Sequence, residues 1–348
     1  MAILSVLLFA GAAVAHTGIR HILIDGNIYH PYDSRIDPLI RPVRRIEWSH
    51  DAMGATFNPI TNFSDPSLAC RENGKYPALK APARAGAEVA TYWTPITRMH
   101  NGPALAYLGR IDSPETKPQD VKFFKIYEYG FNKEKDRWAN EDASDHYDSF
   151  SFKLPSDIKA GTYILRTELI AMHGNMKELK SNGLRGQIQI YPHCFNLEIT
   201  GSGTATPEGV NFPGAYKVDD AGLTFPPFAT YGNDTSPGNE HNSKYVPPGP
   251  PKYNGKYDAP VGPLPVPTET GIYSPELETT YQDLIRKIER PALKLATYIN
   301  TVWPHYHADA DQMKAYGKMG AVAGKEGKEV MAGLKADIAA FKEAAGGK

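Results

Sequence analysis

Apolar and polar residues alternate along several short segments of residues 16–230, and Gly, Pro and Asn separate these segments. Residues 150–154, Phe-Ser-Phe-Lys-Leu, alternate cleanly. The other expected strands are residues 21–27, 88–93, 161–172 and 187–191. A period of two without intervening helices predicts an antiparallel β-sandwich of immunoglobulin or fibronectin type. The stretches 27–60 and 110–148 are expected to form long surface loops on this mainly β scaffold.

The pattern changes after residue 232. Nine prolines fall between residues 237 and 267 without any periodicity, so residues 233–272 are expected to form an extended, semi-rigid linker. Ser274-Pro275-Glu276 is typical of the start of a helix. Apolar residues then recur at helical spacing, and Pro291 should kink or split that helix. A second apolar stripe lies within 309–345, so residues 273–348 are expected to be a helical extension of unknown role.

The chain begins with a short apolar run followed by Ala13-Val14-Ala15, the small-x-small pattern that signal peptidase recognises. Residues 1–15 are therefore expected to be a signal peptide, too short to span a bilayer as a stop-transfer helix. Cleavage would make His16 the first residue of a secreted protein. A terminal histidine offers an amino nitrogen and an imidazole on one residue, and the two together can chelate a metal.

Composition limits the partners of the mature chain. Its charge is nearly balanced, with 38 Lys and Arg against 39 Asp and Glu, which gives no electrostatic reason to expect nucleic acid or an anionic membrane. The two cysteines, Cys70 and Cys194, should form one disulfide in a secreted chain. Asn62 and Asn233 begin N-glycosylation sequons, in agreement with secretion from a eukaryote.

Several motifs in the middle of the chain occur in one order. They are His100-Asn101-Gly102-Pro103, the strand 165–173 ending at His173, Gln189-Ile190-Tyr191-Pro192 and Phe212-Pro213-Gly214. Together with a histidine exposed by cleavage, they resemble the fungal AA9 lytic polysaccharide monooxygenases, formerly glycoside hydrolase family 61. The resemblance covers roughly residues 16–230, so we expect an AA9-like domain over 16–232.

The resemblance implies a copper site. His16 and His100 match the family's histidine brace, in which His16 would bind through its amino nitrogen and one ring nitrogen. Tyr191 matches the axial tyrosine, and an arrangement of nitrogen donors in a plane suits Cu(II). His173 and Gln189 match residues of the family that lie close to the metal without binding it and donate hydrogen bonds to a bound oxygen species. The positions of Cys70 and Cys194 match a bridge in the family.

Two positions depart from the family's usual pattern. Thr167 stands where the family usually has histidine, and His193 stands where it has glutamine. The common second disulfide is absent, because the chain holds no further cysteine. Tyr29 and Tyr32 are candidates to stack on sugar rings at the copper face. His50 and His193 are interpreted as surface or structural histidines.

The function implied is a secreted, monomeric copper monooxygenase that oxidises a β-1,4-linked glucan, cellulose or an associated hemicellulose, at C1 or C4. It would need O₂ or H₂O₂ as co-substrate and an external electron donor, with no cofactor beyond copper. The alternative is a non-catalytic copper-binding cell-wall protein on the same fold. A hydrolase would need two carboxyl groups flanking one bond, and no such pair stands near the motifs.

Overall fold

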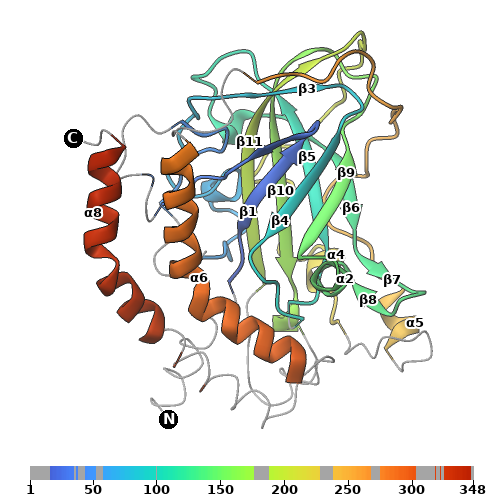
Figure 1. Ribbon diagram of the computed structural model, residues 1–348. Helices are drawn as coiled ribbons and strands as arrows, with labels where there is room; N and C mark the ends of the chain where they lie inside the picture. The colour runs from blue at the N-terminus through green and yellow to red at the C-terminus, as the bar shows by residue number, and fades with distance from the viewer. Residues whose placement is uncertain are drawn as a thin grey trace.

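The computed structural model describes residues 16–34, 37, 44–51, 58–98, 100–175, 188–227, 238–267, 275–302, 318, 322 and 325–345. Two β-sheets stacked face to face form its main body, as Figure 1 shows. The strand order is β2-β1-β4-β9 in the four-stranded sheet and β3-β11-β10-β5-β6 in the five-stranded sheet. The β-sandwich expected from the alternating pattern is confirmed.

The first sheet contains β1 (Ile19–Ile24), β2 (Asn27–Tyr29), β4 (Glu88–Trp93) and β9 (Ser149–Lys153). The second contains β3 (Ala81–Arg84), β5 (Ala104–Arg110), β6 (Phe123–Tyr129), β10 (Gly161–Ala171) and β11 (Gln189–Thr200). A small hairpin is formed by β7 (Phe131–Asn132) and β8 (Arg137–Trp138). The α-helices are α2 (Ala139–Asp145), α4 (Ala221–Thr224), α5 (Asn239–Asn242), α6 (Pro275–Val302) and α8 (Lys335–Ala344). The 3₁₀ turns are η2 (Pro66–Leu68), η3 (Pro118–Asp120) and η4 (His173–Asn175).

The paired strands β10 and β11 form the middle of the larger sheet. Their antiparallel register runs without a break from Gly161 opposite Ile199 to Ala171 opposite Gln189. Alternate residues of both strands, such as Leu165 and Phe195, are completely buried between the sheets. Burial of each such side chain contributes roughly 1.5–3 kcal/mol to the free energy of folding. The pair is therefore a rigid support for the residues at its ends.

The expectation of a surface loop over residues 110–148 is wrong. This stretch contains β6, the β7–β8 hairpin and α2. Strand β6 was not predicted because Lys125 interrupts its apolar run. In the structure, however, the Lys125 side chain is only 1% exposed. Its Nζ lies 2.9 Å from Glu128 Oε2 and donates to the Pro248 carbonyl oxygen at 2.9 Å, so the buried charge is paired.

Residues 238–267 lie against the sandwich, although we expected them to belong to a linker. Tyr245 is buried and packs on Trp138 with ring centroids 4.9 Å apart. Tyr253 N–H donates to the Lys125 carbonyl at 2.7 Å. Farther along, Asn27 Nδ2 donates to the Pro265 carbonyl at 3.1 Å. The proline-rich segment is thus an extended strap that hydrogen bonds and a buried tyrosine attach to the sandwich at several points.

Two C-terminal helices, α6 and α8, run side by side along one flank of the sandwich (Figure 1). Their apolar stripes face each other and form a separate buried cluster that includes Tyr281, Ile288, Leu334, Ile338 and Phe341. Helix α6 bends near its middle and contains Pro291. It also contacts the sandwich, because Glu289 pairs with Arg20 of β1 and the Arg45 guanidinium lies 4.6 Å from the Tyr281 ring centroid.

Within the described part of the chain, no helix combines the length and the apolar character that crossing a bilayer requires.

Cys70 and Cys194 form a disulfide, as the sequence predicted. The bond joins the segment after η2 to β11 and closes a loop with a sequence separation of 124 residues. Replacing both cysteines by alanine should lower the free energy of unfolding by on the order of 4 kcal/mol, because a loop of this length gains that much chain entropy when opened. Guanidinium denaturation of the oxidised protein and of the double variant measures the difference. A change below about 1 kcal/mol would contradict this account.

Candidate metal centre

Four strand ends meet at one end of the sandwich and bring the predicted site residues together. Ile19 pairs with Trp93, so the residues before β1 lie beside the loop after β4. Ala171 pairs with Gln189, which places the end of β10 next to the start of β11. His16 precedes β1, His100 follows β4, His173 follows β10, and Gln189 and Tyr191 begin β11. The topology therefore places all five of these side chains at one end of the sandwich.

The His100-Asn101-Gly102-Pro103 motif has a clear structural reason. Its backbone continues the pairing of β5 with β10, since Ile170 N–H donates to the Pro103 carbonyl at 3.0 Å and Met172 N–H to the Asn101 carbonyl at 2.8 Å. A Cβ atom at position 102 would lie 1.9 Å from the Ile170 carbonyl oxygen, so only glycine allows this close approach. The motif thus holds His100 against the end of β10, where His173 follows.

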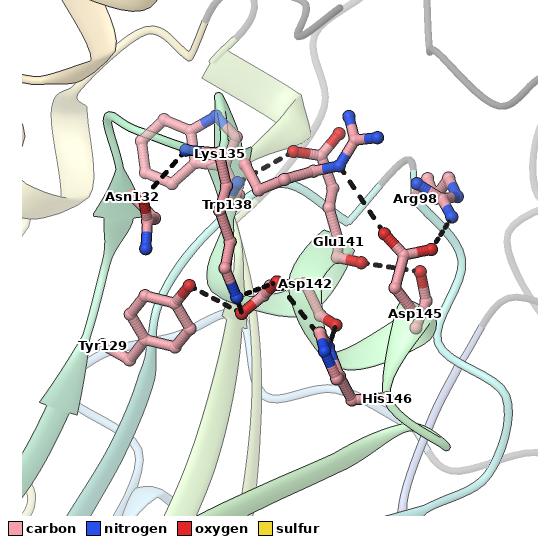
Figure 2. A network of polar contacts seen from close by, with 11 residues as sticks. Arg98, Tyr129, Asn132, Lys135, Trp138, Glu141, Asp142, Asp145 and His146 are labelled. Atoms are coloured by element: carbon pink, nitrogen blue, oxygen red, sulfur yellow. Dashed lines mark hydrogen bonds and ion pairs between the residues drawn. The ribbon is translucent and has the colours of Figure 1, made fainter. Parts of the chain in front are cut away.

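The loop that carries His100 is also fixed to α2. Figure 2 shows Arg98 pairing with Asp145 of α2, and Asp142 receiving contacts from Tyr129 and Lys135. Just outside this network, Asp148 Oδ1 accepts the Ile96 N–H at 2.8 Å, and the Asp148 carbonyl accepts the Trp93 N–H at 2.8 Å. These bonds hold both ends of the loop before it reaches His100.

The aromatic rings of the site lie in mutual contact. The His100 and His173 rings stack with centroids 5.2 Å apart, and the Tyr191 ring lies 5.9 Å from His100 and 6.0 Å from His16. The Tyr191 hydroxyl donates to Gln189 Oε1 at 2.7 Å. The five predicted site residues therefore form one group in space, although they come from four separate parts of the sequence.

The imidazoles of this group are neutral at physiological pH. Burial, followed by the nearby His173 and Arg71, lowers the pKa of His16 to about 4. Burial alone lowers the pKa of His173 to about 4, and burial with the two neighbouring histidines lowers the pKa of His100 well below its usual value. The Nδ1 atoms of His16, His100 and His173 are buried and have no hydrogen-bond partner among the described residues. Neutral rings with unused lone pairs are what a metal ion requires of histidine.

Comparison with known proteins identifies the family. The family model for Auxiliary Activity family 9, formerly glycoside hydrolase family 61, matches residues 16–236. The chain belongs to Auxiliary Activity family 9. Members of AA9 are copper-dependent oxidoreductases that oxidise polysaccharides, so the resemblance seen in the sequence is confirmed and the protein is a lytic polysaccharide monooxygenase.

The AA9 relatives span a large part of the chain. It is 38% identical over 222 residues to AA9 family lytic polysaccharide monooxygenase A of Geotrichum candidum, covering 63% of this chain and 73% of the relative. It is 35% identical over 251 residues to monooxygenase D of the same organism, covering 71% of each chain. Among solved structures, the extended catalytic domain of H. jecorina LPMO9A matches 73% of this chain and 97% of its own, with a TM-score of 0.58 and 26% identity.

Two AA9 site expectations need correction. Tyr29 and Tyr32 cannot stack on a polysaccharide, because only 1% and 8% of their surfaces are exposed. Tyr29 belongs to the core between the sheets, and Tyr32 lies under α6 near Tyr281. The one aromatic residue among the described exposed large hydrophobic side chains is Tyr147, which is 91% exposed in the turn between α2 and β9.

The structure leaves the two sequons open. Asn62 lies on the surface, and its Oδ1 accepts the Ser64 N–H at 3.0 Å, so its glycosylation stays a prediction. Asn233 lies outside the described residues, as does the expected signal peptide of residues 1–15.

A buried polar cluster next to the five predicted site residues was missed by sequence reasoning. Glu47, His50 and His193 bring possible ligand atoms within 4.8 Å of one another, and Arg71 lies beside them. We interpreted His50 and His193 as surface or structural histidines. They are not on the surface, because both side chains are at most 2% exposed. One signal in the sequence pointed here. Thr167 and His193, the two departures from the AA9 pattern, are direct cross-strand partners.

Proposed function

We propose that the mature protein begins at His16 and holds one copper ion through the amino nitrogen and one ring nitrogen of His16 together with a ring nitrogen of His100. Tyr191 would be a further ligand of the ion. The observation that carries this assignment is the meeting of two neutral, buried histidines with unpartnered Nδ1 atoms at one end of the sandwich. Nitrogen donors of this kind fit copper, whose divalent form prefers a tetragonal arrangement of nitrogen and oxygen ligands.

Copper, when bound, supplies the redox chemistry that activates O₂ or H₂O₂ with electrons from an external donor. The residues of the chain orient and enclose the site. Tyr191 is completely buried, and its hydroxyl donates to Gln189, so the Tyr191 ring is held in place and kept from solvent. His173 stacks on His100 and limits the rotation of that ring. We assign His173 and Gln189 to hydrogen bonding with the co-substrate.

The substrate we propose is a β-1,4-linked glucan, cellulose or an associated hemicellulose, oxidised at C1, C4 or both. The AA9 membership supports a polysaccharide substrate. We further propose that the protein is secreted, in keeping with the cleavage pattern before His16 and the disulfide, and that it acts as a monomer.

The decisive experiment incubates the processed protein with one equivalent of copper, ascorbate and phosphoric-acid-swollen cellulose or xyloglucan, and identifies soluble products by mass spectrometry. We expect oxidised oligosaccharides that depend on both copper and ascorbate. The C1 aldonic acid and the C4 gem-diol have the same mass, so fragmentation of the product ions distinguishes C1 attack from C4 attack. His100→Gln serves as the control and should release none. Tight copper binding without oxidised products from any of several glucans would favour the alternative, a non-catalytic copper-binding protein.

Tyr147 is the residue we expect to contact the polysaccharide. It adjoins Asp148, which bonds to Trp93 and Ile96 at the start of the His100 loop, and its side chain is 91% exposed. Tyr147→Ala should weaken binding to insoluble cellulose about fivefold, corresponding to about 1 kcal/mol of lost contact. Tyr147→Phe keeps the ring and should bind normally. Pull-down isotherms measure the affinities, and equal binding of all three proteins would exclude this role.

A further inference from the structure

His193 occupies an unusual place for a polar residue. It lies on β11 between Tyr191 and Phe195, on the face that points toward the other sheet, and it is 1% exposed. Its ring meets Trp93 of the opposite sheet edge-on, with centroids 5.4 Å apart. An imidazole buried this deeply requires a hydrogen-bond partner for each nitrogen.

Both ring nitrogens of His193 have such partners. Nε2 lies 3.4 Å from the Ile19 amide nitrogen and 3.2 Å from Arg71 Nη2. Ile19 N–H and the guanidinium can only donate, so Nε2 must be the unprotonated acceptor. The proton of the neutral ring is therefore on Nδ1, which donates to Glu47 Oε1 at 2.6 Å. Glu47 Oε2 in turn accepts the Tyr32 N–H at 2.6 Å.

This tautomer argues against a metal ion at Glu47, His50 and His193. A metal on Nδ1 of His193 would displace its proton and direct an N–H from Nε2 toward two other donors. Arg71, which is 3% exposed, would also place its positive charge close to that metal. Burial lowers the pKa of Arg71 to about 10, so the guanidinium stays charged at neutral pH. The cluster fits a chain of hydrogen bonds better than it fits a metal site.

The chain of hydrogen bonds ends at the segment that carries His16. The β1–β4 ladder is irregular between Ile19 and His21, and there the Ile19 N–H is bonded by a side chain. The preceding residues are held by Thr94, which bonds to Thr17 through its carbonyl at 3.0 Å and to Gly18 N–H through its hydroxyl at 3.2 Å. His193 therefore holds Ile19, which is three residues after His16, and acts in addition to Thr94.

We propose that His193 is a positioning residue of the copper site, which fixes the path of residues 16–19 through the Ile19 amide and is itself held in one tautomer by Glu47 and Arg71. The inference rests on the proposed function, because it assumes that His16 binds copper. Residues that orient a metal ligand in this way commonly change metal affinity about 10- to 100-fold when they are removed. The inference assigns a role to one of the two positions that depart from the AA9 pattern.

The test compares His193→Leu with His193→Gln in the processed protein. Leucine removes the acceptor at similar volume, whereas the glutamine amide can accept from Ile19 and donate to Glu47. We expect His193→Leu to raise the copper dissociation constant about tenfold in calorimetry and to change the Cu(II) hyperfine coupling in the electron paramagnetic resonance spectrum. His193→Gln should restore both values. Tyr163→Phe, which removes the hydrogen bond to the Lys159 carbonyl at the far end of β10, is the control for stability loss alone and should leave the copper spectrum unchanged.

A measurement on the unsubstituted, metal-free protein guards against a variant that does not fold. The Ile19 amide should exchange with deuterium as slowly as the amides inside β1, since its hydrogen bond is buried. Three results would each overturn the proposal. They are rapid exchange of the Ile19 amide, a normal copper spectrum and affinity in His193→Leu, and a second bound metal that is lost in His50→Gln. Failure of the unsubstituted protein to bind copper would instead overturn the proposed function, so the two failures are distinguishable.

Discussion

A single methionine added before His16 is expected to weaken copper binding by more than about 100-fold. The added residue converts the His16 amine into an amide, which is a poor copper donor at neutral pH, so the proposed site would lose one of its three nitrogen ligands. Changing residues that only hydrogen-bond to the ligands lowers metal affinity about 10- to 100-fold, so the loss of a direct ligand should lower it by more. Isothermal titration of both forms with Cu(II) measures the effect, and product release from cellulose should fall with it.

The matched control carries the same methionine at the C-terminus, after Lys348, and should bind copper normally. The fold should not change, because Thr17 and Gly18 keep their hydrogen bonds to Thr94 in either form. Equal melting temperatures of the metal-free proteins would establish this point. If the extended protein bound copper as tightly as the processed one, His16 would not be a terminal ligand and the proposed site would be wrong.

Truncation is expected to separate two parts of the C-terminal region sharply. A chain that ends at Pro267 should fold and bind copper, whereas a chain that ends at Thr235 should be destabilised by about 3–5 kcal/mol, comparable to removing a buried aromatic side chain. The shorter chain exposes the Trp138 surface that Tyr245 covers and leaves the buried Lys125 ammonium without the Pro248 carbonyl. A melting temperature lower by roughly 10 °C follows for a domain of this size.

Thermal denaturation and copper titration of the two truncated proteins and the full chain provide the measurement. Residues 16–267 should retain the copper spectrum and the oxidation of soluble substrate. Among the described residues, the loss of α6 removes contacts to Arg20 and Arg45 but none to the five proposed site residues. Equal stability of the two truncated proteins would show that the segment 238–267 is a linker in energetic terms. Failure of both to hold copper would place α6 and α8 in the core domain.

The sequence predicted the fold class because its strands are two-sided. Strand β9 places apolar side chains toward the core at every second residue, and this periodicity can be read from the sequence without knowledge of the partner strand. Strand β10 is buried along almost its whole length on both faces. Strand β11 was expected to end at Tyr191 but continues through Pro192 to Thr200. The N–H groups of Ile190 and Asn196 point away from β10, toward the carbonyls of Ile60 and Ile46. The N–H that Pro192 lacks would lie on the same side, between these two contacts. Proline is therefore tolerated there, because no hydrogen bond to β10 is lost.

What the sequence determined by itself was local chemistry: strand periodicity, the glycine that lets His100 approach β10, and the order of motifs that placed the chain in AA9. Tertiary structure alone decided which polar residues are buried and how they are paired. Lys125, Glu47, Arg71 and His193 appear in the sequence as ordinary surface residues, yet all four are at most 3% exposed. Their burial depends on partners 3 to 146 residues away, such as Glu128 for Lys125 and Glu47 for His193. A buried charge or imidazole is stable only when such partners exist, and only the folded chain brings them into reach.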